Sequence, residues 1–135
     1  MNLDWRAIRA GGSVALVFAV PFSFAARWFA DNDSSSSAAM WLSILALLGF
    51  LLGGGVAGWT QRRDLPMVHG IVAAVLTYLV AQAVFVVVRL TLGREVHWFA
   101  VFFNLTAVAF VGLIGGILAG VLHRRGLYPS SVERR

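Results

Sequence analysis

Residues 41–80 read WLSILALLGFLLGGGVAGWTQRRDLPMVHGIVAAVLTYLV, two apolar runs on either side of a short charged link. The charged side chains of this stretch are confined to the link, at Arg62, Arg63 and Asp64. A helix of about 20 apolar residues is long enough to cross a hydrocarbon core of about 30 Å. A link this short joins antiparallel neighbours. The stretch therefore predicts a hairpin of two transmembrane helices.

The rest of the chain repeats this pattern and predicts an all-α fold, an integral membrane bundle of four transmembrane helices. We expect a transmembrane domain over residues 1–125 and a cytoplasmic tail over residues 126–135. The expected spans are residues 7–29, 38–60, 66–90 and 97–122. We expect Ser34 to Ser37 to cap the second span, and Asp64, close before Pro66, to cap the third.

Composition supports a membrane location and argues against other classes of protein. The chain is 59% hydrophobic and 13% charged, which is too apolar for a soluble surface. Its net charge of +5 comes from arginines that are scattered among span ends, so we expect no nucleic-acid partner. The first apolar run could also be a signal peptide cleaved after Ala25, but its length, Pro21 and Arg27 favour a span.

The arginines predict the orientation of the bundle. Eight lie on one expected side, namely Arg6, Arg9, Arg62, Arg63, Arg124, Arg125, Arg134 and Arg135. Three lie on the other side, namely Arg27, Arg89 and Arg94. Arginine-rich flanks are usually cytoplasmic, so we expect both termini in the cytoplasm. The pairs Arg62–Arg63 and Arg124–Arg125 should contact anionic lipid headgroups, or the acidic surface of a partner.

An internal repeat is suggested when the chain is shifted against itself by 62 residues. Seven of thirteen positions from Gly53 to Leu65 then match identical residues from Gly115 to Leu127, and Arg27 matches Arg89. Such a duplication would give two tandem hairpins in the same orientation. Alternatively, small residues and arginines simply recur at the helix ends of a glycine-rich membrane protein.

Glycines form stripes of small residues in the second and fourth spans. The candidate helix-packing residues are Gly49, Gly53, Gly54, Gly58, Gly112, Gly116 and Gly120. Close backbone approach is a main source of helix association in lipid, and small residues permit it. These faces would either pack the four spans together or hold a second copy or a partner subunit.

A few polar side chains inside the spans form a candidate polar site at Tyr78, Gln82 and Asn104. The Gln82 and Asn104 amides are expected to bond to each other, and the alternative is that they contact a solute together with Tyr78. No Asp, Glu or Lys lies in an expected span, which argues against a proton-coupled exporter.

No pattern for catalysis, a cofactor or a metal stands out in the sequence. Cysteine is absent, so thiolate chemistry and cysteine ligands are excluded. His69 and His123 should lie near the same surface, but a metal site needs three suitable ligands within reach. We therefore expect a protein that is not an enzyme and has no cofactor.

The residues Gly54 to Gly58, the basic link, His69-Gly70 and Tyr78 together resemble a known pattern. It is the AG-link-HG-Y pattern of the YrzE-like family, small four-helix bacterial membrane proteins of uncharacterised function. The resemblance covers the hairpin of the second and third spans. It implies a four-span fold in a bacterial cytoplasmic membrane and no known activity.

Two functions are compatible with these patterns. The first is a non-enzymatic membrane protein that packs with itself or with a larger membrane assembly through its glycine faces. The second is a small transporter or channel for a neutral or lipidic solute, which would use Tyr78, Gln82 and Asn104 at a cavity.

Overall fold

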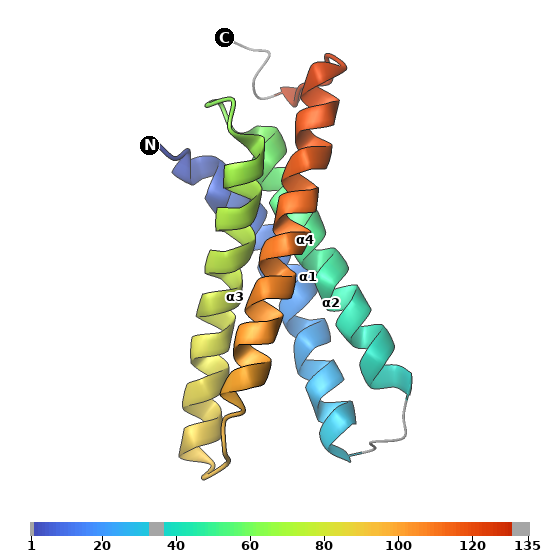
Figure 1. Cartoon of the computed structure of the whole chain (residues 1–135), viewed down its shortest axis with the longest axis vertical. Helices are drawn as coiled ribbons and strands as arrows, with labels where there is room; N and C mark the ends of the chain where they lie inside the picture. The colour runs from blue at the N-terminus through green and yellow to red at the C-terminus, as the bar shows by residue number, and fades with distance from the viewer. Residues whose placement is uncertain (1, 33–36, 131–135) are drawn as a thin grey trace.

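The computed structural model describes residues 2–32 and 37–130, and this part of the chain forms four α-helices without strands. Figure 1 shows them as α1 (Trp5–Asn32), α2 (Ser37–Thr60), α3 (Pro66–Thr91) and α4 (Trp98–Arg124). All four are long and apolar enough to cross a membrane. The prediction of an all-α, four-helix membrane bundle is confirmed.

The four helices form two hairpins that diverge along the bundle. In Figure 1, the start of α1, the end of α4 and the link between α2 and α3 lie at the top, which we call the terminal end. The α3–α4 link lies at the bottom, which we call the far end, where α1 and α2 stand apart from α3 and α4. Helix α2 packs against the other three helices, while α1 and α4 lie on opposite sides of the bundle.

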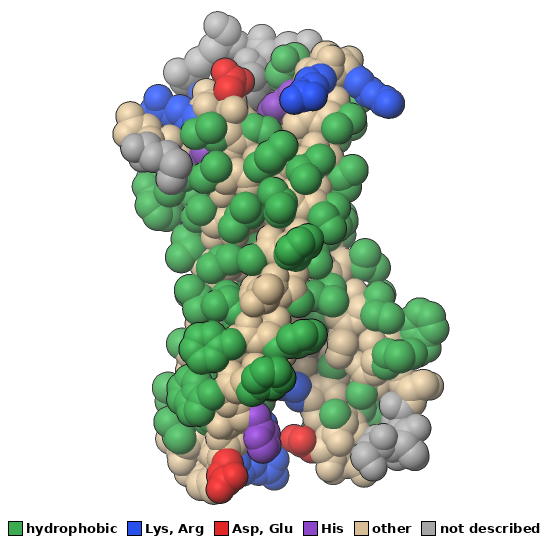
Figure 2. All heavy atoms as spheres, in the orientation of Figure 1, with side chains coloured by type: hydrophobic (Ala, Val, Ile, Leu, Met, Phe, Trp, Pro, Cys, Tyr) green, Lys and Arg blue, Asp and Glu red, His purple; other side chains and the backbone are tan. Residues whose placement is uncertain are grey.

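The centre of the bundle is built from small residues. Ala15, Ala19, Ala57 and Ala74 are fully buried, and the largest fully buried side chain is that of His69. Figure 2 shows hydrophobic side chains along the visible face, with the charged groups gathered toward the two ends. Bulky apolar groups pointing outward and small ones inward are expected where the surrounding solvent is lipid.

His69 joins α3 to the start of α1 at the terminal end. Its Nε2 accepts a hydrogen bond of 2.8 Å from the backbone N–H of Asp4, and its Nδ1 lies 2.8 Å from the carbonyl oxygen of Leu65. The carboxylate of Asp4 accepts hydrogen bonds from the backbone N–H groups of Arg6 at 3.1 Å and Arg62 at 3.3 Å. Asp4 therefore caps α1 and also holds the α2–α3 link.

The predicted cap of α3 is wrong. Leu65 occupies the N-cap position and no side chain caps the helix, while Asp64 has a left-handed backbone with φ of 54°. That conformation differs from the extended one that an N-cap residue adopts. The buried Gln61 supplies the acceptor instead, because its Oε1 lies 2.6 Å from the N–H of Arg63 and 3.3 Å from that of Leu65. The other predicted cap, at Ser34 to Ser37, falls mostly outside the described residues.

Candidate functional site: a cleft between the hairpins

A cleft lies between the two hairpins near the far end, and we call it the interhairpin cleft. It comprises three adjoining hollows of about 410, 220 and 40 Å³, all of which are bordered by Arg27. Figure 2 shows an opening near the bottom of the molecule with arginine, histidine and acidic side chains around it. The residues of the cleft that carry its chemistry are Ser23, Arg27, Tyr78, Gln82, Phe85 and Asn104.

Arg27 reaches from α1 across to α3. Its Nη2 donates a hydrogen bond of 3.0 Å to Oε1 of Gln82, and its Cζ lies 3.7 Å from the ring centroid of Phe85. A guanidinium over an aromatic ring gains a cation–π attraction, which strengthens where water is scarce. Arg27 is thus held in the cleft by one polar and one aromatic partner.

Arg89 approaches the same aromatic ring from α3. Its Cζ lies 5.5 Å from the centroid of Phe85. Its Nε is buried and has no hydrogen-bond partner among the described residues. Two guanidinium groups therefore share one ring at the border of the cleft, and one of them has an unused donor.

The three polar residues predicted from the sequence all border the cleft, but the expected amide pair is not formed. Gln82 is buried and bonds to Arg27, whereas Asn104 is exposed. A charged donor forms a stronger hydrogen bond than a neutral amide, which explains this choice of partner. The Tyr78 hydroxyl donates a hydrogen bond of 2.9 Å to the carbonyl of Val101 and so ties α3 to α4.

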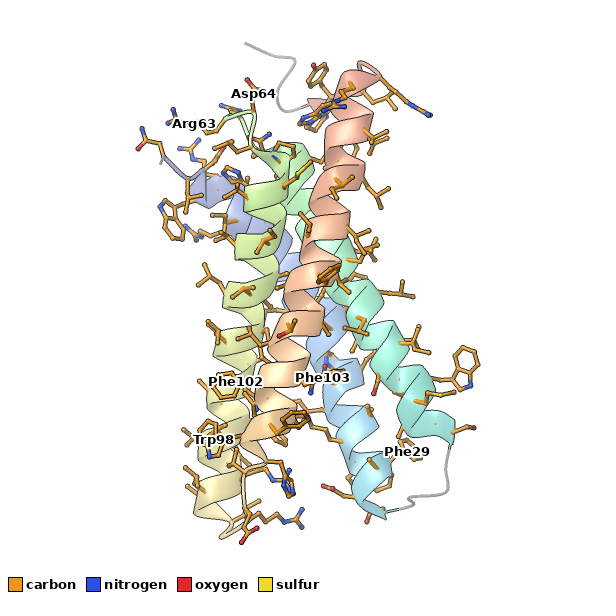
Figure 3. All side chains as sticks on the ribbon, in the orientation of Figure 1. Phe29, Arg63, Asp64, Trp98, Phe102 and Phe103 are labelled. Carbon is orange, nitrogen blue, oxygen red and sulfur yellow. The ribbon has the colours of Figure 1, made fainter. Side chains whose placement is uncertain are left out.

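An exposed ion pair lies at the mouth of the cleft. Nη1 of Arg94 is 3.6 Å from Oδ2 of Asp31, and Asp31 also borders the smaller of the two main hollows. His97 borders that hollow as well. Phe103, labelled in Figure 3, borders the largest hollow from α4. The cleft therefore combines a charged mouth with an apolar wall.

Sequence reasoning used Arg27 and Arg89 for orientation and missed them as site residues. A signal was available, because the 62-residue shift pairs these two arginines and both interrupt the final turns of apolar helices. Phe85 gave no comparable signal, since one phenylalanine among ten is not distinctive.

The four arginines predicted to contact lipid headgroups are exposed. Arg62 and Arg63 border a hollow of about 580 Å³ together with Arg6 and Asp4. Figure 3 labels Arg63 and Asp64 at the terminal end. Arg124 and Arg125 follow from the end of α4. All four thus lie around the terminal end of the bundle.

The histidines at the terminal end have protein partners. Nε2 of His123 lies 2.9 Å from the carbonyl oxygen of Trp59, and its ring stacks on Tyr128. His69 bonds to Asp4 and Leu65, as described above. Within residues 2–32 and 37–130, no three His, Cys, Asp or Glu residues lie close enough to hold a metal ion.

The glycines of α2 are covered by neighbouring helices of the same chain. A Cβ added to Gly49 would lie 2.7 Å from the backbone nitrogen of Ala19, and one on Gly53 would lie 2.6 Å from the Cβ of Ala15. On Gly54 it would lie 3.0 Å from the Cα of Gly112. A Cβ on Gly58 would lie 2.8 Å from the Pro66 carbonyl oxygen.

Three glycines of α4, Gly112, Gly116 and Gly120, face α3 in the same way. A Cβ on Gly112 would lie 2.6 Å from the Cβ of Ala74, and one on Gly116 would lie 2.6 Å from the Pro66 carbonyl oxygen. Gly120 is looser, with Cγ of Pro66 at 3.3 Å. Each of the seven glycines singled out in the sequence therefore faces another helix of its own chain.

Comparison of the chain with protein-family models, curated proteins and solved structures finds no match. Its function is therefore inferred from the interhairpin cleft itself.

Proposed function

We propose that this multi-pass membrane protein is not an enzyme and binds a lipidic solute in the interhairpin cleft, as a small transporter does. The observation that carries the proposal is the position of Arg27, which borders all three hollows of the cleft. A ligand site typically joins apolar walls to a few convergent polar groups. The cleft has this composition.

The partial burial of a charged side chain near the end of an apolar helix supports a functional role for Arg27. A charged side chain within a span is expensive and usually marks a pathway or a binding site. If only packing were required, apolar residues of similar volume would often stabilise a bundle equally well or better. The bond to Gln82 and the contact with Phe85 reduce this cost without filling the hollows around the guanidinium.

The shape of the bundle supports entry of an elongated, partly apolar solute. The hairpins diverge toward the far end (Figure 1), and the largest hollow of the cleft lies between them. Its apolar wall includes Met40, Leu47 and Phe103, which suit an acyl chain. A solute could thus place its polar end at Arg27 and its chain along this wall.

Association with another copy or a larger assembly through the glycine faces stays a prediction. The contacts favour it less than solute binding, because all seven glycines already pack within one chain. A partner that used these faces would have to separate the helices first.

For the membrane and the orientation, we propose a bacterial cytoplasmic membrane with both termini in the cytoplasm. The distribution of arginines supports this orientation, since Arg62, Arg63, Arg124 and Arg125 share the terminal end. The resemblance to the YrzE-like family supports the bacterial assignment. The arginines of the terminal end would then contact the anionic lipids of the inner leaflet.

Protection of an introduced thiol tests solute binding. The chain has no cysteine, so Asn104→Cys provides a single thiol on the wall of the cleft. In detergent, short-chain phospholipid should slow its reaction with a water-soluble methanethiosulfonate reagent. The control is Thr106→Cys, an exposed position on α4 that borders none of the described hollows. Equal lipid effects on the two thiols would contradict the proposal.

A further inference from the structure

The electrostatic balance of the interhairpin cleft indicates the class of solute. Arg27 and Arg89 both place a guanidinium beside Phe85. Among the described residues that border the cleft, Asp31 carries the one carboxylate, and it already pairs with Arg94 at 3.6 Å. The cleft therefore holds an excess of positive charge.

Among the described residues, Asp31 is the one acid that acts on Arg27, and Arg94 already pairs with it. Gln82 is a neutral partner, and Phe85 offers only its ring face. Removing a charge from water without an opposite charge is costly, so such a site favours an anionic ligand.

The hydrogen-bond donors of the two arginines point to oxygen acceptors. A guanidinium has five N–H donors arranged in a planar fork that matches phosphate and carboxylate oxygens. The bond to Gln82 uses one donor of Arg27, and the buried Nε of Arg89 is unpaired. An anionic group between the arginines would satisfy donors that the described part of the chain leaves without acceptors.

The hollows beside the arginines favour a lipid over a free ion. The largest, of about 410 Å³, extends from Arg27 along the apolar side chains of α2 and α4, including Phe103. A small inorganic ion would leave that apolar wall uncovered. An acyl chain attached to the anionic group would cover it.

Resting on the function proposed above, we infer that the occupant of the cleft is a membrane lipid with an anionic phosphate headgroup, bound by Arg27 and Arg89. The phosphate oxygens accept hydrogen bonds from the two guanidinium groups, and an acyl chain lies along the apolar wall. Arg27 also contacts Gln82 and Phe85, whereas Arg89 has the looser ring contact. Arg89 is therefore the better position at which to remove a charge without disturbing the bundle.

The test measures lipid affinity of the full chain in detergent by native mass spectrometry. The probes are short-chain phosphatidylglycerol, phosphatidylcholine, diacylglycerol and inorganic phosphate. We expect phosphatidylglycerol to bind at least about tenfold more tightly than phosphatidylcholine or diacylglycerol, because it alone among the lipids brings a net negative charge. Inorganic phosphate should bind more weakly than phosphatidylglycerol.

Three variants test whether Arg27 and Arg89 cause the preference for phosphatidylglycerol. Arg89→Gln and Arg27→Gln should each remove most of the preference for phosphatidylglycerol. Arg9→Gln is the matched control, because it removes the same charge from an exposed position on α1 outside the cleft. It should keep the preference of the unmodified chain. Circular dichroism of each variant checks that the helices are retained. If Arg27→Gln does not fold, the lipid preference of Arg89→Gln alone tests the inference.

The outcomes separate this inference from the proposed function. If all three lipids protect Asn104→Cys and bind equally well, the cleft binds lipid but the anionic headgroup is wrong. Equal affinity for inorganic phosphate and phosphatidylglycerol would show that the site recognises a free anion. If no lipid protects the thiol or binds, both proposals fail.

Discussion

Gln82 accepts a hydrogen bond from Arg27 at 3.0 Å, and this bond joins the two hairpins near the end where they diverge. Gln82 is buried, and the guanidinium that it receives lies against Phe85. The bond therefore fixes the spacing of the cleft as well as the position of its charge.

Replacing Gln82 should destabilise the bundle. Gln82→Leu removes the acceptor of a charged donor and should lower the free energy of unfolding by about 1.5–3 kcal/mol. Asn104→Leu, on helix α4 of the same hairpin, should change it by less than about 0.5 kcal/mol because Asn104 is exposed. Unfolding in a titration with sodium dodecyl sulfate, followed by circular dichroism, gives both values. Similar losses in the two variants would argue against the Arg27–Gln82 bond.

Glycine substitutions should separate packing within the chain from association between chains. A Cβ on Gly116 would lie 2.6 Å from the Pro66 carbonyl oxygen and 2.7 Å from the Cα of Met67. Gly116→Ala should therefore reduce stability by about 1–3 kcal/mol. In Gly55→Ala the new Cβ would lie 3.7 Å from its nearest neighbour, the Gly115 carbonyl oxygen, so this control should be neutral or slightly stabilising.

The dependence on protein concentration of the stability loss in Gly116→Ala distinguishes packing within the chain from association between chains. Because the contact of Gly116 lies within one chain, the stability difference should be the same at all protein-to-detergent ratios. A loss that disappears on dilution would show instead that Gly116 acts between chains.

His69 should be far more sensitive to substitution than His97. His69→Leu leaves the N–H of Asp4 without its acceptor in a partly buried site, which should reduce stability by about 1–3 kcal/mol. His97→Leu changes an exposed residue and should have little effect. Thermal unfolding in micelles compares the two. Backbone amide exchange at Asp4 should also speed up in the His69 variant alone.

The orientation can be tested with single thiols in sealed inverted membrane vesicles. Arg63→Cys and Arg125→Cys should react with an impermeant maleimide in these vesicles, whereas Arg94→Cys should react only after the membrane is opened. The absence of native cysteine makes each signal unambiguous. Reaction of Arg63→Cys and Arg125→Cys from opposite faces would contradict the four-span topology.

The four-helix fold could be predicted from the sequence because a bilayer permits few backbone structures. Long apolar runs that end at charged residues must become helices, since lipid offers no partners for free backbone groups. The loop between α2 and α3 was harder to predict. Asp64 is a good cap by residue type, but its left-handed backbone leaves the loop's N–H groups to Gln61.

The cleft was harder still to predict, because it depends on how the helices are rotated and how far apart they stand. The spacing of residues in the sequence predicts that Gln82 and Asn104 lie at similar depth. It does not show that Gln82 forms its hydrogen bond with Arg27 and not with Asn104. A long side chain near a helix end is assigned to the interface by default. Because the hairpins diverge, the side chains of Arg27 and Arg89 border a cavity.

The two contacts of His69 also determine where its proton resides. Nε2 accepts from the peptide N–H of Asp4, so in the neutral ring the hydrogen must be on Nδ1, where it faces the carbonyl of Leu65. The side chain of free histidine in water favours the other tautomer, with the hydrogen on Nε2. Nitrogen-15 chemical shifts of the ring thus report whether the first residues of the chain are docked on the third helix.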